Sequence, residues 1–314
     1  MVVSMPWGAP YYGSKAAQIA LFDSLVSAHP TLIRKETIGY TVQGQALPMY
    51  RVGNVNGGKF LFDGAIHGCS DLSTICHYLF LKWLLESGEA RANNILQKKC
   101  LLVVPAFNLD RSERKNARDV GLGWRYGVDL NRNFSYNWSS SGTTDPIDDY
   151  YHGPNAASEP ETQAMKNLFV SEQPEIYVNF HNWGGPIFRS VCANSAQQTF
   201  SQKLANDYST VRQQLGIAYT YSYGQGGLSA GYSTADAALA TGMKASFLIE
   251  ICNMNDPNEM SPAVERIEPE FYPRIKPILI AFAEAVTDGL TPSQKYLFSQ
   301  WQDEKLDNPR TVVT

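Results

Sequence analysis

The sequence lacks the basic and apolar runs that would point to nucleic acid or to a membrane. It contains no stretch of Lys or Arg long enough to neutralise several phosphates, and its formal net charge is −4. Proteins that bind nucleic acid gain much of their affinity from such basic contacts. No window approaches the roughly 18 uninterrupted apolar residues that a membrane-spanning helix needs. We therefore expect neither nucleic acid nor a membrane as a partner, and small molecules or peptides are favoured.

Cysteine is also scarce, and the first residues lack the features of an export signal. The five cysteines are odd in number, widely spaced and free of any C-x-x-C pair; they are Cys69, Cys76, Cys100, Cys192 and Cys252. This pattern argues against a disulfide framework and against a thiolate zinc site. Residues 1–15 show no charged leader followed by an apolar core. We expect a reducing, cytoplasmic location, with release by cell lysis as the alternative.

What the sequence does contain is a regular alternation of strand and helix patterns. Apolar spacing predicts helices at 15–29, from about 72, from 159 and at 275–286. Apolar or alternating runs predict strands at 37–42, 47–52, 60–66, 100–105, 175–180, 187–191 and 247–251. This alternation predicts an α/β fold, a single-domain α/β/α sandwich with a mixed, largely parallel twisted sheet. We expect one domain over residues 1–314.

Two local signals refine this prediction. Ser158 and Glu161 have the spacing of a capping box, and Pro160 is harmless in a first helical turn. The loop over 108–150 is far longer than the usual connection of about four to six residues, and long loops in compact domains are usually functional.

Polar residues at the ends of the buried strands are the first candidates for chemistry, because ligands bind at the carboxyl ends of strands in open α/β sheets. These residues are His67, Asn108, Asp110, His181 and Glu250. Two imidazoles and a carboxylate from separate strands suit a catalytic zinc, which takes three protein ligands and keeps one open position. Glu250 is the strongest signal, because a carboxylate in an apolar strand is costly unless something compensates it.

Other reactive residue types have plainer interpretations. His29 and His77 lie on helical patterns, where a hydrogen-bonded structural histidine is commoner than a metal ligand. Cys69 and Cys252 are alternative nucleophiles beside a histidine, but no activation motif surrounds them. We expect them to be small buried residues.

Several segments of the chain form recognisable motifs. They are Ile38-Gly-Tyr-Thr-Val-Gln-Gly, Ala65-Ile-His-Gly, Arg114-Lys-Asn, Gly127-Val-Asp-Leu-Asn-Arg-Asn-Phe, Gly153-Pro-Asn-Ala-Ala-Ser-Glu-Pro-Glu-Thr, Asn179-Phe-His-Asn-Trp and Ser246-Phe-Leu-Ile-Glu. In order and spacing, these segments resemble the zinc carboxypeptidase family over nearly the whole chain. The stretches GVDLNRNF and SEPET are the most specific, because neither composition nor periodicity explains them.

The resemblance implies a Zn²⁺ cofactor and a set of catalytic roles. His67 and His181 would bind zinc, and Glu250 would move a proton from water to the leaving amine. Arg114 would stabilise the oxyanion at the scissile carbonyl.

The same resemblance implies a peptide substrate with a free C-terminal carboxylate. Asn131 and Arg132, named here the carboxylate clamp, would hold that group through charge-assisted hydrogen bonds. The capping aromatic residue would be Tyr232, with Tyr221 and Tyr223 as alternatives in or beside a glycine-rich stretch that suits a lid. Ala235 suggests a roomy, uncharged pocket that favours apolar or aromatic terminal residues, whereas Asp236 would favour basic ones if it faced the pocket.

The pattern breaks at the third metal ligand. The family's first metal segment is H-x-x-E, but Ser70 stands here where the glutamate belongs. A hydroxyl is a poor zinc ligand, so metal affinity should fall. Three explanations compete: Asp71 substitutes, although it would point about 100° away from position 70 on a helix; the serine is an introduced, disabling change; or the chain is a naturally weakened homologue.

Four functions are therefore open. The first is a zinc carboxypeptidase, or a disabled form of one, and a close variant would hydrolyse peptidoglycan peptides. A non-catalytic peptide-binding homologue would use the carboxylate clamp alone, and Ser70 is its main support. A deacylase of N-acyl amino acids is a more distant alternative.

Overall fold

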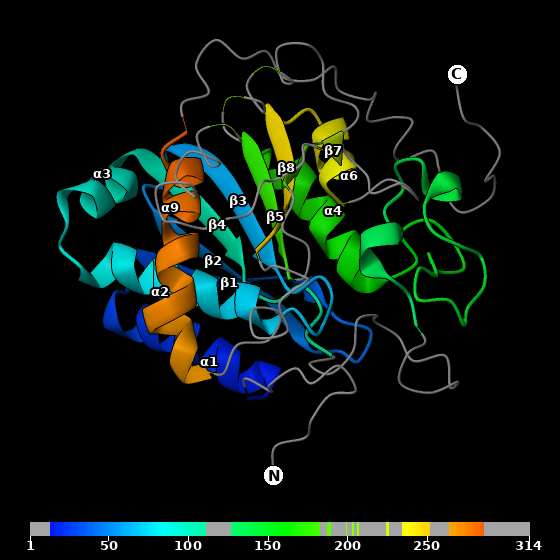
Figure 1. Cartoon of the computed structure of the whole chain (residues 1–314), viewed down its shortest axis with the longest axis horizontal. Coiled ribbons are helices and arrows are strands. Elements are labelled where there is room, and N and C mark those ends of the chain that lie inside the picture. Colours follow the sequence, from blue (N-terminus) through cyan, green and yellow to red (C-terminus); the bar gives the residue numbers. More distant parts are fainter. Residues whose placement is uncertain are drawn as a thin grey trace.

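In the computed structural model, a single mixed sheet lies between two layers of helices (Figure 1). The structure describes residues 13–110, 127–182, 187–189, 199, 203, 206, 224–225, 234–251 and 264–285. The strands are β1 (Ile33–Tyr40), β2 (Ala46–Gly53), β3 (Gly58–Gly64), β4 (Lys99–Val104), β5 (Ile176–His181), β6 (Ile187–Arg189), β7 (Gly224–Gln225) and β8 (Ala245–Glu250). Within the described ranges their order across the sheet is β1-β2-β4-β3-β5-β8-β6-β7.

The central strands are parallel and the edges are mixed. The pairs β4–β3, β3–β5 and β5–β8 are parallel, whereas β1–β2, β2–β4 and β6–β8 are antiparallel. The predicted largely parallel sheet is confirmed. Parallel neighbours end at the same edge, so β3, β5 and β8 bring their carboxyl ends together.

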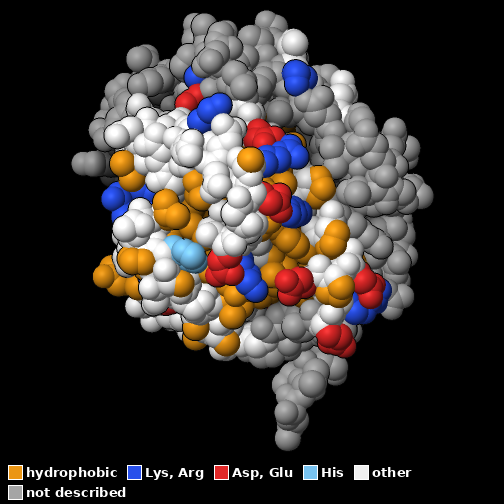
Figure 2. Space-filling model, turned by 90° about the vertical axis from the view of Figure 1, so that its left-hand side faces the viewer, with side chains coloured by type: hydrophobic (Ala, Val, Ile, Leu, Met, Phe, Trp, Pro, Cys, Tyr) orange, Lys and Arg blue, Asp and Glu red, His pale blue; other side chains and the backbone are white. Residues whose placement is uncertain are grey.

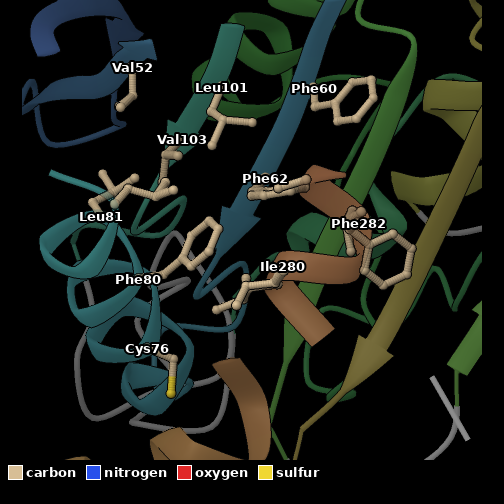
Figure 3. Close-up of a cluster of buried hydrophobic side chains, with 14 of the residues drawn as sticks. Val52, Phe60, Phe62, Cys76, Phe80, Leu81, Leu101, Val103, Ile280 and Phe282 are labelled. Carbon is tan, nitrogen blue, oxygen red and sulfur yellow. The ribbon is translucent and has the colours of Figure 1, made fainter. Parts of the chain in front are cut away.

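Helices cover both faces of the sheet, as predicted. They are α1 (Lys15–Ala28), α2 (Asp71–Glu86), α3 (Ala90–Lys98), α4 (Pro160–Glu172), α6 (Thr234–Ala240), α8 (Val264–Arg266) and α9 (Tyr272–Ala283), with a π turn at Ile267–Phe271 before α9. One cluster of buried side chains joins α1, α2, α3 and α9 to one face of the sheet, and a second joins α4 and α6 to the other. In the first cluster Phe80 of α2 and Ile280 of α9 lie against Phe62 of β3 (Figure 3). Burying a side chain of this size stabilises the fold by about 1.5–3 kcal/mol.

The helix of SEPET begins where predicted, but not through a capping box. Glu161 accepts a hydrogen bond from the backbone N–H of Val42 (2.9 Å), in the turn between β1 and β2. The Ser158 hydroxyl instead bonds Asn133 Nδ2 (2.9 Å) and Glu159 Oε1 (2.7 Å). The capping-box prediction was wrong because tertiary partners engage both side chains. Pro160 does occupy the first turn of α4.

Two further elements differ from the prediction. Helix α3 was not expected, because only Ala92, Ile95 and Leu96 of its nine residues are buried and the rest of the segment is polar. In the glycine-rich stretch interpreted as a lid, Gly224–Gln225 forms strand β7, parallel to β6. The described parts of the long loop, 108–110 and 127–150, contain the short 3₁₀ turns Leu130–Arg132 and Trp138–Ser140, and Thr143 forms an isolated β-bridge with Tyr151.

The surface agrees with the composition. On the face shown in Figure 2, basic and acidic side chains lie interspersed over the described region. Among the described residues, no helix combines the length and apolar character needed to cross a bilayer.

Candidate functional site

The turn after β3 carries His67 and contains one residue, Ala65, in an unusual backbone conformation. Ala65 adopts φ of 50°, a left-handed value that costs a non-glycine residue roughly 1–3 kcal/mol. The Ser73 hydroxyl supports it by accepting the Ala65 N–H (3.0 Å) and donating to the Ser70 carbonyl (2.6 Å). Gly64 must lack a side chain, because its Cβ would lie 2.8 Å from Ser73 Oγ. The segment between β3 and α2 is therefore built to present His67.

His67, His181 and Glu250 converge at the carboxyl edge of the sheet. His181 and Glu250 are the last residues of β5 and β8 and lie opposite each other in register, so their side chains leave the same face. The ring centroids of His67 and His181 are 4.9 Å apart. Glu250 is 8% exposed, and burial raises its pKa to about 8.

Each of the two imidazoles is oriented by an oxygen atom. His67 Nε2 lies 3.1 Å from Asp129 Oδ1, and His181 Nε2 is bonded to Asn179 Oδ1. A carboxylate or amide oxygen only accepts, so Nε2 carries a proton in both rings, and in the neutral form of each ring Nδ1 carries the lone pair. Metal-binding histidines in proteins are held in this manner.

Asp129 and Asn179 are the site residues that sequence reasoning missed. Asp129 lies inside the GVDLNRNF stretch, which is specific, but its function there was not assigned. Its Oδ1 also accepts the Asn131 N–H (3.0 Å), so one buried carboxylate joins the first histidine to the carboxylate clamp. Asn179 lies two residues before His181, and the two-residue period of a strand puts both on one face.

A further buried carboxylate stands behind Asn179. Asp63 on β3 accepts from Asn179 Nδ2 (2.7 Å) and from the Tyr177 hydroxyl (2.8 Å), and it is fully buried. Burial raises the pKa of Asp63 to about 7, although both hydrogen bonds oppose that rise. The pKa of Tyr177 is raised well above its ordinary value, by burial first and by the Asp63 charge second.

The carboxylate clamp lies in the 3₁₀ turn Leu130–Arg132. Asn131 Oδ1 accepts from both the N–H and the hydroxyl of Thr234 (2.9 Å each), which directs its Nδ2 donor elsewhere. Arg132 is 4% exposed, lies 5.6 Å from the Tyr150 ring centroid, and donates to the Asn131 carbonyl (3.2 Å). Its Nε has no hydrogen-bond partner in the part of the chain that the structure describes. Arg132 is thus a buried cation with unused donor capacity, not one side of a surface ion pair.

The remaining predicted residues are only partly placed. Ala235 is 2% exposed and packs against Leu248, and Asp236 is fully buried. The predicted positions that lie outside the described residues are Arg114, Cys192, Tyr221, Tyr223, Tyr232 and Cys252. Cys69 is a small buried residue, as expected.

Asp110 contacts the turn between β1 and β2, and not the histidines beside which its strand-end position suggested it would lie. Asp110 accepts from Thr41 Oγ1 (2.6 Å), Gln43 N (3.1 Å) and Gln45 Nε2 (2.8 Å), so it organises the β1–β2 turn. Asn108 is fully buried, and its N–H bonds the Ala65 carbonyl (2.9 Å). Their position after a strand was a correct observation, but the turn between β1 and β2 competes for the Asp110 carboxylate.

The third ligand position carries no carboxylate. Ser70 is 1% exposed, and the neighbouring Asp71 forms a buried ion pair with Lys15 of α1. Among the described residues, no group of three His, Cys, Asp or Glu side chains could hold a metal ion. The two oriented imidazoles fit zinc, and the donor set is complete at two of the three protein positions.

Comparison with known proteins agrees with this architecture. A stretch of 181 residues is 30% identical to mast cell carboxypeptidase A of Rattus norvegicus, covering 51% of this chain and 43% of that protein, so the match spans less than half of its length. Carboxypeptidase B of Homo sapiens is 26% identical over 248 residues, covering 72% of this chain and 60% of that protein. The solved structure of thrombin activatable fibrinolysis inhibitor shares the fold with a TM-score of 0.79 at 18% identity, over 89% of this chain and 75% of the other.

The family model for zinc carboxypeptidase matches residues 19–272, which span both histidines, the carboxylate clamp and Glu250. The chain belongs to the zinc carboxypeptidase family.

Proposed function

We propose that this chain binds peptides by their free C-terminal carboxylate and acts as a metallocarboxypeptidase whose metal affinity is reduced by Ser70. The observation that carries the proposal is the pair His67 and His181, each held through Nε2 by a buried acceptor oxygen beside Glu250. When bound, zinc supplies a Lewis acid that polarises a carbonyl and acidifies water.

The chain's own residues would divide the remaining work. Glu250 would hold a proton taken from the attacking water and deliver it to the leaving amine. Its buried position favours the neutral form, and a cation at the neighbouring histidines would favour the charged form. Arg114, from the resemblance, would stabilise the oxyanion.

Recognition of the substrate end would rest on the carboxylate clamp. A terminal carboxylate would satisfy the buried guanidinium of Arg132 and the Nδ2 donor of Asn131, which Thr234 turns away from itself. An interior peptide bond offers no such charge, so the clamp would favour exopeptidase action. Ala235 and Tyr232 remain the predicted pocket and capping residues.

A second candidate function is non-catalytic peptide binding. It is favoured by one observation: Asp71, which follows the third ligand position in the sequence, is paired with Lys15. Under this alternative the clamp would bind peptides while zinc would not be retained.

The two functions separate in one experiment. Zinc content and hydrolysis of a blocked dipeptide panel would be measured for the protein and for Ser70→Glu, with Ser70→Gln as the control that matches glutamate in size but lacks its charge. We expect Ser70→Glu to raise zinc affinity on the order of 100-fold, which is a small part of the binding free energy that structural zinc sites reach. Hydrolysis should rise with it. Ser70→Gln should raise neither zinc affinity nor hydrolysis.

The outcomes are distinct. If all three proteins are inert and free of zinc, His67 and His181 are not ligands, and the zinc proposal is wrong. If the protein still bound a dipeptide, and lost that affinity when the dipeptide's carboxylate was amidated, the result would support non-catalytic peptide binding.

A further inference from the structure

Asn179 stands between a histidine and a carboxylate, and its orientation has chemical consequences. A carboxamide presents an acceptor oxygen on one side and a donor NH₂ on the other. With Oδ1 toward His181, the imidazole must carry its proton on Nε2, whereas with Nδ2 toward His181 the proton must move to Nδ1. The second arrangement would remove the lone pair from the nitrogen that the site needs.

The group on the far side of Asn179 decides between these orientations. Asp63 Oδ1 accepts from Asn179 Nδ2 (2.7 Å), and Asp63 Oδ2 accepts from the Tyr177 hydroxyl (2.8 Å). Turning the amide over would set its oxygen against a carboxylate oxygen at a position with no exposure to water. While Asp63 is ionised, the two acceptors that would then face each other have neither a proton nor solvent between them.

The strand register makes the contact a built feature of the sheet. Asp63 of β3 and Asn179 of β5 are paired residues in adjacent parallel strands. Tyr177, Asn179 and His181 are alternate residues of β5, so all three leave the same face of the sheet. The chain Tyr177–Asp63–Asn179–His181 therefore needs no loop to hold it.

We infer that Asp63 is a positioning residue for His181: acting through Asn179, it selects the Nε2–H tautomer and presents Nδ1 as the ligand atom. The inference rests on the proposed function for the use made of Nδ1. The tautomer itself is a property of the metal-free protein and is tested without activity.

The first test is the tautomer of His181 in the metal-free protein, read from the nitrogen chemical shifts of its ring and assigned by loss of the signal in His181→Gln. A single Nε2–H form is expected. A proton on Nδ1 would overturn the inference, whatever any variant does.

The second test compares two matched variants, one of Asp63 itself and one of its other hydrogen-bond partner, Tyr177. Asp63→Asn has the same shape but offers an oxygen or an NH₂ to Asn179, so both tautomers of His181 should appear. Tyr177→Phe removes the other hydrogen bond of Asp63 but leaves Oδ1 in place, so the single tautomer should persist. Affinity for zinc alone should fall about tenfold in Asp63→Asn, the lower end of the cost of outer-shell substitutions, and remain near that of the parent in Tyr177→Phe.

The readouts separate the two proposals. A folded Asp63→Asn protein that keeps the single Nε2–H tautomer would overturn the positioning role. If no protein binds zinc while the tautomers behave as expected, the positioning role stands and the zinc-dependent function fails.

Discussion

His77 and the pair formed by His67 and His181 occupy opposite surroundings in this molecule. His77 of α2 is 1% exposed, lies against the Phe62 and Phe180 rings, and neither ring nitrogen has a hydrogen-bond partner among the described residues. His67 and His181 lie at the carboxyl edge of the sheet, where an oxygen fixes each Nε2. Burial thus makes one histidine a neutral packing residue, whereas a paired acceptor makes the others potential ligands. The partner of the ring, and not burial itself, distinguishes the two regions.

The largest effect is expected where the charged end of α2 meets α1, one residue from Ser70. Asp71→Asn leaves Lys15 buried and unpaired, which should cost about 3–5 kcal/mol of unfolding free energy, whereas Lys15→Met with Asp71→Leu should recover most of it. Urea unfolding measures both. As a control, Arg34→Ala removes an exposed ion pair with Glu36 and should cost less than about 1 kcal/mol. A similar small cost for Asp71→Asn would mean that the site end is no more dependent on pairing than the surface.

The next effect concerns the carboxylate clamp. Arg132→Ala should weaken binding of a blocked dipeptide by about 2–5 kcal/mol, since it removes one partner of a buried charge pair. Titration calorimetry measures the loss. The amidated dipeptide provides the control, because it lacks the carboxylate and its weak binding should change little. Equal losses for both ligands would show that Arg132 acts through folding and not through recognition.

A smaller effect is expected at Asp129, the hydrogen-bond acceptor of His67. Asp129→Ala removes the acceptor that holds His67 Nε2 and should reduce zinc affinity by about 10- to 100-fold. The measurement is competition with a coloured chelator. Asp145→Ala, in an exposed loop, is the matched carboxylate control and should leave affinity unchanged. An unchanged affinity in Asp129→Ala would remove the distinction between paired and unpaired rings.

The smallest effect is expected at His77, which lies in apolar surroundings and should change how stability depends on pH. Burial alone lowers the pKa of His77 to about 3, well below its unfolded value of about 6.5. The unfolded chain therefore binds more protons between these values, and His77 destabilises the fold as pH falls below about 6.5, by at most about 1.4 kcal/mol per pH unit. His77→Phe should remove that part of the pH dependence. Urea unfolding at pH 7 and pH 5 tests it; an unchanged difference between the two would mean that His77 is charged or paired in the folded state.

Much of the fold could be predicted from the sequence, because its signals are local. The alternation of apolar strands and amphipathic helices indicated the sandwich, and Pro160 correctly marked the first turn of α4. The failures involve side chains with distant partners. Glu161 lies in a capping-box spacing, but Val42, 119 positions away, takes its carboxylate. Helix α3 was missed because its buried face has only three residues.

The site divides in the same way. His67, His181 and Glu250 were found because each lies at or just after the end of a buried strand, a position that sequence shows directly. Asp110 shares that position but serves the β1–β2 turn, which no local pattern reveals. Asp63 and Asp129 could not be assigned, because their partners lie 116 and 62 positions away.

The sequence by itself determined the strand and helix order, the family motifs and the absence of a glutamate at position 70, since each of these is carried by residue identity and short spacing. Only the tertiary structure decided that Asp71 forms an ion pair with Lys15 and that Arg132 is a buried cation. It also decided that Asp63 controls the orientation of Asn179 beside His181. The physical reason is that hydrogen-bond and charge pairing depend on which groups the sheet register and helix packing bring within about 3 Å, and that proximity is not written in any single segment.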